Sequence, residues 1–217
     1  MAPYRDRKDA GHELGNLLVK LLPDLDILVL ALPRGGVVVG YEVARALRAE
    51  LDIFLVRKLG MPGDEEFAIG ALASGGIRVL NEEAVRKFHV SQEAIDHVTA
   101  REQRELQRRE QVYREGRAPA VISGRTVVVV DDGLATGSTM LAACRAVRSA
   151  GPRRLVAAVP VGSRQACRNL RNVTDETICA MTPEPFTAIG SWYQDFRQTT
   201  DEEVRELLEQ AARERAS

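Results

Sequence analysis

The sequence is poor in the residues that build metal centres and disulfide frameworks. Among its 217 residues are three cysteines and three histidines, which are Cys144, Cys167, Cys179, His12, His89 and His97. The cysteines are odd in number and widely spaced, and neither residue type shows the spacing of a zinc site. The sequence therefore argues against a zinc site and against a disulfide framework, and it favours a reducing, cytoplasmic location.

An excess of one charge and long apolar runs are also missing. Lysine and arginine number 30 against 31 aspartates and glutamates, so the net charge is −1. Binding of nucleic acid through its phosphates usually needs a basic excess, so nucleic acid is a disfavoured partner. The longest apolar runs, such as residues 27–33, are far shorter than the ~20 residues that span a bilayer. The charged N-terminal residues also lack the apolar stretch of a signal peptide, so we expect no membrane partner.

What the sequence does contain is a globular composition with alternating strand and helix patterns. Hydrophobic residues make up 45% and charged residues 28%, which excludes disorder as the main state. Short apolar runs predict strands at residues 25–32, 52–56, 126–130, 155–159 and 177–181. Helical periodicity predicts helices at residues 10–22, 37–47, 139–147, 164–170 and 201–213. This alternation predicts a single α/β domain over residues 1–217, with three layers around a mainly parallel sheet.

Residues 61–117 interrupt this alternation as an insertion. A hairpin is predicted within residues 67–80, and Asn81 and Ser91 are candidate N-caps of the two helices that follow. Residues 101–117 contain six arginines and four glutamates. This composition is typical of a solvated, salt-bridged helix, and a helix that folds over an anionic substrate is the alternative. After the last strand, residues 182–217 are predicted to form a C-terminal hood that includes a charged helix.

The most informative segment is residues 127–139, which read VVVVDDGLATGST. The four valines predict a strand buried on both faces. Its carboxyl end would deliver Asp131 and Asp132 to the crevice where open α/β sheets bind ligands. The segment then enters a helix through Ala135, Thr136, Gly137, Ser138 and Thr139. The free amides of that helix start, its dipole and the neighbouring hydroxyls suit an anion. Acids beside an anion site predict a ligand with hydroxyls and phosphate, such as a phosphorylated ribose.

Two common nucleotide motifs are missing from the chain. The Gly-Lys-Ser/Thr sequence of a P-loop is absent, and no G-x-G-x-x-G opens the first helix. These absences exclude a P-loop and disfavour a dinucleotide site.

Residues 127–139 resemble the fingerprint of the type I phosphoribosyltransferases, in which an apolar strand, two acids and a Thr-Gly loop follow one another. The resemblance implies that Asp131 and Asp132 hold the ribose hydroxyls of phosphoribosyl pyrophosphate, and that residues 135–139 bind its 5′-phosphate. Gly133 departs from the family, which more often has a branched aliphatic residue there. More broadly, residues 4–11, 32–47 and 57–73 resemble a bacterial group of uncharacterised predicted phosphoribosyltransferases.

Two further segments fit this resemblance. Residues 32–36 resemble the family's pyrophosphate loop, in which Arg34, Gly35 and Gly36 would face the diphosphate, and a plain turn is the alternative. The resemblance also implies a non-proline cis peptide near Arg34–Gly35. Lys58 ends the second predicted strand, where family members often place a basic residue against the pyrophosphate. A solvent-exposed strand end explains Lys58 equally well. The insertion, in turn, occupies the place of a family loop that closes over the reacting centre.

The predicted hood is rich in aromatic residues. Four of the chain's ten aromatic residues lie there, and they are Phe186, Trp192, Tyr193 and Phe196. The family's hood lies over the base, so Trp192 and Tyr193 are candidates to stack on a planar acceptor. The alternative is that these aromatic residues form the core of the hood or a contact between two subunits.

The resemblance implies a Mg²⁺-dependent transferase that moves the 5-phosphoribosyl group to a nitrogen acceptor and releases pyrophosphate. Asp131, Asp132, Arg34 and Lys58 would carry the reaction. Mg²⁺ would be held mainly through the substrate, and no residue is assigned as its ligand. The acceptor would be a small molecule of the nucleobase-like class.

Three matters stay open at this point. No spacing ties His12 or His97 to the site, so the general base for the acceptor is unassigned. The family commonly forms dimers, so we expect a homodimer. The same fold also serves non-catalytic sensors of phosphoribosyl pyrophosphate, which is the main alternative. A phosphatase or hydrolase of phosphorylated sugars is the third possibility.

Overall fold

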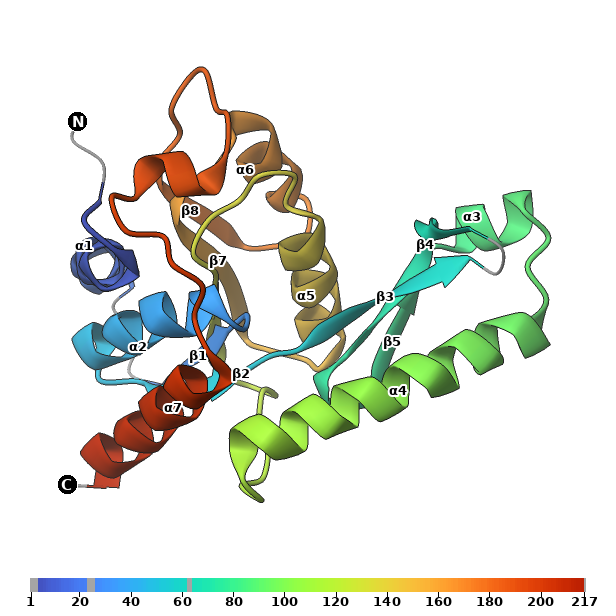
Figure 1. Ribbon diagram of the computed structural model, residues 1–217, viewed down its shortest axis with the longest axis horizontal. Coiled ribbons are helices and arrows are strands. Elements are labelled where there is room, and N and C mark those ends of the chain that lie inside the picture. Colours follow the sequence, from blue (N-terminus) through green and yellow to red (C-terminus); the bar gives the residue numbers. More distant parts are fainter. Residues whose placement is uncertain (1–3, 23–25, 62–63, 217) are drawn as a thin grey trace.

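Five parallel strands form the central sheet of the computed structural model, which describes residues 4–22, 26–61 and 64–216 (Figure 1). They are β1 (Ile27–Ala31), β2 (Glu50–Ile53), β6 (Thr126–Val130), β7 (Arg154–Val161) and β8 (Glu176–Met181). Their order is β2-β1-β6-β7-β8, and every neighbouring pair is parallel. β1 and β6 are buried along their whole length, as expected for aliphatic strands with helices on both faces.

Helices cover both faces of this sheet. They are α1 (Arg7–Leu21), α2 (Gly35–Leu47), α5 (Ser138–Ser149) and α6 (Arg164–Leu170). One face packs on α1 and α2 through a cluster that includes Leu14 and Val128. The other packs on α5 and α6 through a cluster that includes Met140 and Val129. Neighbouring valines of β6 thus point to opposite faces, as the strand period requires. The prediction of three layers around a mainly parallel sheet is confirmed.

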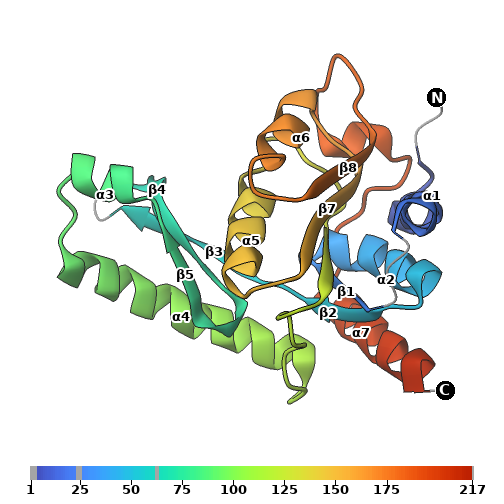
Figure 2. The same ribbon diagram turned by 180° about the vertical axis from the view of Figure 1, so that it is seen from behind.

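The insertion begins at Val56 rather than at residue 61, and it forms a separate antiparallel sheet and two helices. The elements are β3 (Val56–Met61), β4 (Asp64–Ala73), β5 (Ile77–Leu80), α3 (Glu82–Lys87) and α4 (Gln92–Arg114). Both views show these elements projecting from the parallel sheet (Figure 1 and Figure 2). The predicted hairpin is confirmed as β4 and β5. Asn81 and Ser91 cap α3 and α4 through their side chains, as predicted.

The predicted strand at residues 52–56 is wrong in its bounds, because the chain changes sheets there. β2 ends at Ile53. The amide of Leu55 then donates to Ser74 Oγ at 2.9 Å, and β3 begins at Val56. One apolar run therefore serves two sheets, which hydrophobic periodicity alone cannot distinguish from one strand.

The charged helix α4 is only in part the solvated face that was predicted. Near its middle, Glu105 pairs with the partly exposed Arg108 and Arg109, at 2.9 and 2.8 Å. At its end, Arg114 is 5% exposed and donates to both carboxylate oxygens of Asp52, at 3.1 and 3.2 Å. The prediction is wrong for Arg114, because this end of α4 approaches β2 and its guanidinium compensates a carboxylate that is largely removed from water.

The N-terminal segment lies beside the hood (Figure 1). Tyr4 exchanges backbone hydrogen bonds with the hood: its amide donates to Trp192 and its carbonyl accepts from Gln194, both at 2.8 Å. Residues 182–200 are irregular except for a short 3₁₀ turn, and α7 (Asp201–Ala216) follows. Among the residues described here, no helix is both long enough and apolar enough to cross a membrane.

Candidate functional site

Asp131 and Asp132 stand at the carboxyl end of β6, as predicted. Both are partly buried, and the Asp132 side chain is 14% exposed. Asp131 Oδ1 accepts a hydrogen bond from the Asp132 amide at 2.8 Å. Burial raises the pKa of both carboxyls, and the Asp132 charge raises the pKa of Asp131 further, whereas Arg7 lowers both. Two crowded carboxylates of this kind favour ligands that donate hydrogen bonds or carry positive charge.

The loop between β1 and α2 lies directly against these acids. A Cβ atom on Gly35 would stand 2.1 Å from Asp132 Oδ2, and one on Gly36 would stand 2.9 Å from Asp131 Oδ1. No larger residue fits there without displacing an acid, so the backbone of the two glycines forms one wall of the acid turn. The structure thus brings two of the predicted motifs together, although they lie about a hundred residues apart in the sequence.

Arg34 projects to the other side of this loop. The peptide bond that precedes it is cis, one bond before the predicted Arg34–Gly35 position. Its guanidinium lies 3.7 Å from Asp201 Oδ1 at the start of α7. It lines a cavity of about 400 Å³ together with Arg108, Arg109 and Tyr113 of α4. Arg34 therefore faces the helix of the insertion, while its glycine neighbours face the acids.

Residues 135–139 form the turn into α5, as predicted. Gly137 has a φ of 76°, in the left-handed region that favours glycine. The helix begins at Ser138, whose hydroxyl lies 3.2 Å from that of Thr136. Four of the five residues of the turn are solvent-exposed. The turn therefore leaves amides of the first helical turn, together with the hydroxyls, accessible to an anion.

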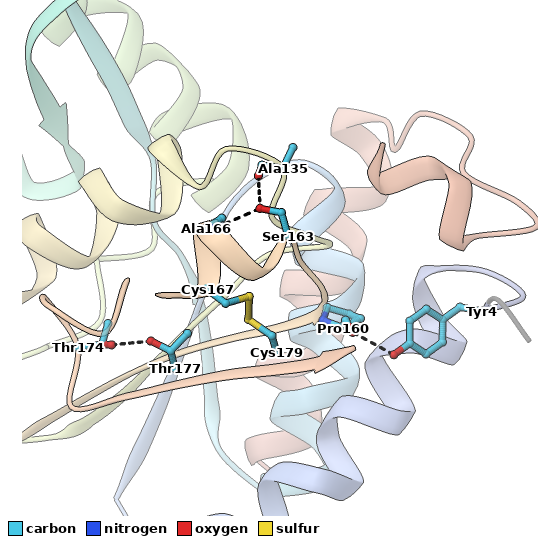
Figure 3. The surroundings of a disulfide bond; sticks show 9 residues. All are labelled: Tyr4, Ala135, Pro160, Ser163, Ala166, Cys167, Thr174, Thr177 and Cys179. Carbon is cyan, nitrogen blue, oxygen red and sulfur yellow. Dashed lines mark hydrogen bonds between the residues drawn. A yellow bond between two sulfur atoms is a disulfide. The ribbon is translucent and has the colours of Figure 1, made fainter. Parts of the chain in front are cut away.

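The start of α6 contacts this turn, and a disulfide joins α6 to β8 (Figure 3). Ser163 Oγ, at the start of α6, donates to the Ala135 carbonyl at 2.7 Å. Cys167 of α6 and Cys179 of β8 form a disulfide, which the sequence, read as arguing against a disulfide framework, did not predict. The spacing concealed this pair, because the chain folds back after α6 and brings two Cα atoms twelve residues apart to 6.6 Å. Cys144 is a buried free thiol.

The two residues predicted to stack on the acceptor occupy unequal positions. Tyr193 is 6% exposed, and its hydroxyl donates to the Asp132 carbonyl at 2.6 Å. Its ring packs between Tyr4 and Phe196, with centroids at 5.6 and 4.9 Å. Tyr193 therefore belongs to the hood core, the alternative left open by the sequence. Trp192 is only partly buried, and its role in stacking stays a prediction.

Arg7, in the first turn of α1, is the candidate that the sequence did not reveal. Its side chain is 11% exposed, and Nε donates to Asp132 Oδ2 at 2.7 Å. A terminal nitrogen donates to the Arg197 carbonyl at 2.7 Å, and the guanidinium lies 3.8 Å from the centroid of the Phe196 ring. These partners are 125 to 190 residues away in sequence. The local pattern therefore showed only a charged residue ahead of the helix predicted at residues 10–22.

Lys58 does not stand at the end of a parallel strand. It lies in β3, opposite Ala71 of β4, and its side chain is exposed. The structure places it in the antiparallel sheet, while the acids follow the parallel one. Its role against a pyrophosphate stays a prediction.

Gly133 departs from the family pattern for a steric reason. A Cβ atom on Gly133 would stand 2.6 Å from Ile189 Cγ2 in the hood. Ile189 therefore fills the space that a branched side chain at position 133 would need.

A family model described as the phosphoribosyl transferase domain matches residues 16–182. The chain belongs to this family. Two curated Mycobacterium tuberculosis proteins, from strains CDC 1551 and H37Rv, carry the provisional name phosphoribosyl transferase and are each 44% identical over 214 residues. The match covers 99% of this chain and 48% of each relative. The chain therefore spans about half the length of the curated relatives it matches.

Solved structures show the same architecture over nearly the whole chain. TT1426 from Thermus thermophilus is 45% identical with a TM-score of 0.86, and the match covers 96% of this chain and 98% of that one. AQ2163 from Aquifex aeolicus is 12% identical with a TM-score of 0.52, over 93% of this chain and 84% of that one. The second likeness concerns the fold alone.

Proposed function

We propose that the protein transfers the 5-phosphoribosyl group of phosphoribosyl pyrophosphate to a nitrogen of a small acceptor and releases pyrophosphate. The observation that carries the proposal is the convergence of three segments beside the carboxyl ends of β1 and β6. These segments are the two acids, the glycines of the β1–α2 loop and the turn at residues 135–139. The substrate carries hydroxyls, a diphosphate and a phosphate, which are the groups that these segments suit.

The reaction forms one bond and breaks one at C1′ of the ribose. The lone pair of the acceptor nitrogen attacks C1′, and the electrons of the C1′–oxygen bond leave with the pyrophosphate. Positive charge builds on the sugar ring meanwhile. Asp131 and Asp132 would accept hydrogen bonds from the ribose hydroxyls and place negative charge beside that ring. The proton of the acceptor would pass to a base that is not assigned to any residue.

The phosphates would be held at the two ends of the sugar. The exposed turn at residues 135–139 would bind the 5′-phosphate, and the backbone of Gly35 and Gly36 would face the pyrophosphate. Arg34 and Lys58 would offset the charge of the leaving group.

Magnesium fits this site as an ion held mainly by oxygens of the substrate. Within residues 4–22, 26–61 and 64–216, no three His, Cys, Asp or Glu side chains form a group that could hold a metal. The crowded carboxylates nevertheless favour a cation near the sugar. A bound ion would neutralise charge on the departing pyrophosphate.

The remaining details of the proposal rest on the sequence and the family resemblance. They are a nucleobase-like acceptor, a homodimer and a cytoplasmic location. The cysteines no longer support a reducing compartment, because Cys167 and Cys179 are paired.

The decisive test is acceptor-dependent release of pyrophosphate from phosphoribosyl pyrophosphate and Mg²⁺. Pools of nucleobases and of pyridine carboxylates would be screened, with Asp132→Asn as the matched control. We expect the wild-type protein to release pyrophosphate with one of the pools, and we expect Asp132→Asn to lose this release. Tight binding of the substrate without release in any pool would point to a sensor. Release of phosphate or ribose phosphate without an acceptor would point to a hydrolase, and either result would overturn the proposal.

A further inference from the structure

Arg7 lies where the acid turn, the β1–α2 loop and the hood meet. Its Nε is 2.7 Å from Asp132 Oδ2 and would stand 2.6 Å from a Cβ atom on Gly35. The same guanidinium donates to the Arg197 carbonyl and stacks on the Phe196 ring. One side chain from the start of α1 therefore contacts a proposed sugar-binding acid and two residues of the hood.

This contact leaves the acid able to bind a further donor. Arg7 reaches Asp132 through Nε alone, on one of the two carboxylate oxygens. An ionised carboxylate has about four acceptor sites on its two oxygens. Asp132 can therefore accept from a ribose hydroxyl while Arg7 keeps its hydrogen bond, so the substrate need not displace the arginine.

We propose that Arg7 is a positioning residue for the sugar end of the site: it fixes the orientation of the Asp132 carboxylate toward the ribose and fastens the hood beside it. This inference rests on the proposed function and names a residue outside the fingerprint at residues 127–139. A guanidinium suits the task because its planar fork serves the carboxylate and the carbonyl, while its face lies on an aromatic ring. A lysine ammonium at this position would supply the charge without that geometry.

The charges around Asp132 give the inference a second readout. Its carboxylate faces Asp131 in its own turn and Arg7 from α1, and the β1–α2 loop presents only glycine backbone. The hood presents Tyr193, whose hydroxyl binds the Asp132 carbonyl, and Glu203 of α7 lies near enough to interact with Arg7. Arg7 is thus the cation that lowers the pKa of Asp132 against the effect of burial. Without it, this carboxyl would be protonated at a higher pH and would stop accepting from the ribose earlier as the pH falls.

The experiment compares Arg7→Ala, Arg7→Lys and Arg5→Ala with the wild-type protein. Arg5 is the matched control, because it lies two residues away and its ion pair with Asp9 is at the surface, with the arginine 76% exposed. Phosphoribosyl pyrophosphate affinity with Mg²⁺ would be measured by calorimetry across pH, beside the melting temperature. Arg7→Ala should weaken binding roughly 10- to 100-fold, the range for a hydrogen bond to a charged group. Its affinity should also fall at a higher pH than that of the wild-type protein.

The other variants separate positioning from folding. Arg7→Lys should lose less affinity than Arg7→Ala, and Arg5→Ala should change it less than about twofold. If Arg7→Ala melts too low to assay, Arg7→Lys carries the test, and added methylguanidinium should restore binding to a partly folded Arg7→Ala.

Three outcomes would overturn the inference. Wild-type affinity and an unchanged pH profile in a folded Arg7→Ala would remove any role at the sugar. Tighter binding by Arg7→Ala would show that Arg7 occupies the sugar-binding position and that the substrate must displace it. Failure of the wild-type protein to bind phosphoribosyl pyrophosphate would overturn the proposed function first and this inference with it.

Discussion

The candidate site has a floor and a cover that are built in different ways. The floor consists of residues 130–139 with Gly35 and Gly36, and its shape is set by backbone: a parallel strand, close glycines and a helix start. The cover consists of four side chains from the N-terminal segment and the hood, which are Tyr4, Arg7, Tyr193 and Phe196. In the proposed function the floor would supply the groups that touch the substrate, whereas the cover would hold those groups in position.

The largest expected effect is on stability, and it comes from the disulfide that joins α6 to β8. Reduction of Cys167–Cys179, which are twelve residues apart, should lower the free energy of unfolding by about 3 kcal/mol, the value for a closed loop of roughly 15 residues. In a chain of this size that corresponds to a fall of roughly 6–12 °C in melting temperature. The measurement is thermal unfolding with and without a reductant.

Two cysteine variants keep that experiment specific. Cys144→Ala should keep the response to reductant, because Cys144 is not bonded. Cys179→Ser should melt at the temperature of the reduced protein and respond no further. An oxidised wild-type protein that melts at the same temperature as the reduced one would show that the two sulfurs are not joined.

Within the floor, Asp132→Asn should weaken phosphoribosyl pyrophosphate binding or turnover more than about tenfold, about 1.4 kcal/mol. The amide keeps the shape of the carboxylate and loses its charge toward both the ribose and Arg7. Lowering the pH should also weaken binding by the wild-type protein. Burial raises the pKa of both acids, so they become protonated at a higher pH than an ordinary aspartate does. A folded variant with wild-type affinity and turnover would remove the acids from the site.

Within the cover, Tyr193→Phe removes one hydrogen bond to the Asp132 carbonyl. This loss should cost about 1 kcal/mol, or roughly fivefold in affinity. Tyr41→Phe is the matched control, since it removes a hydrogen bond of 2.8 Å to Glu214, away from the acids and from Arg34. Titration calorimetry of both variants checks the difference. If Tyr193→Phe weakened binding no more than its control, this residue of the cover would not hold the acid turn.

The floor could be predicted from the sequence. Of the cover, Tyr193 and Phe196 were predicted as hood residues, but their contacts with Tyr4 and Arg7 could not be predicted. Asp131, Asp132 and residues 135–139 are consecutive, so their order on a buried strand and a helix start fixes their arrangement. The β1–α2 loop was assigned to the site through the family resemblance, and it fits there because carboxyl ends of neighbouring parallel strands meet at one edge of a sheet. The first inference needs only local pattern and the general geometry of an α/β sheet, whereas the second also needs the resemblance.

Contacts between distant segments carry no such pattern. Arg7 and Asp132 are 125 residues apart, and no period or spacing joins them. The same limit concealed the disulfide and the burial of Arg114 in α4, where Asp52 supplies the partner from another element. Lys58 was misplaced for a different reason. The sequence assigned it to the end of a parallel strand, but the chain crosses to the antiparallel sheet before this residue.

Arg108 tests whether the insertion adds a third part to the site. Its partner Glu105 lies on the same partly exposed helix face, so Arg108→Ala should change phosphoribosyl pyrophosphate affinity less than about twofold, about 0.4 kcal/mol. Arg86→Ala, which breaks another exposed pair on α3, is the matched control, and both are measured by the same calorimetric titration. A loss more than about fivefold for Arg108→Ala alone would mean that the cavity it shares with Arg34 holds part of the substrate. The helix would then fold over an anionic ligand, and floor and cover would no longer account for the whole site.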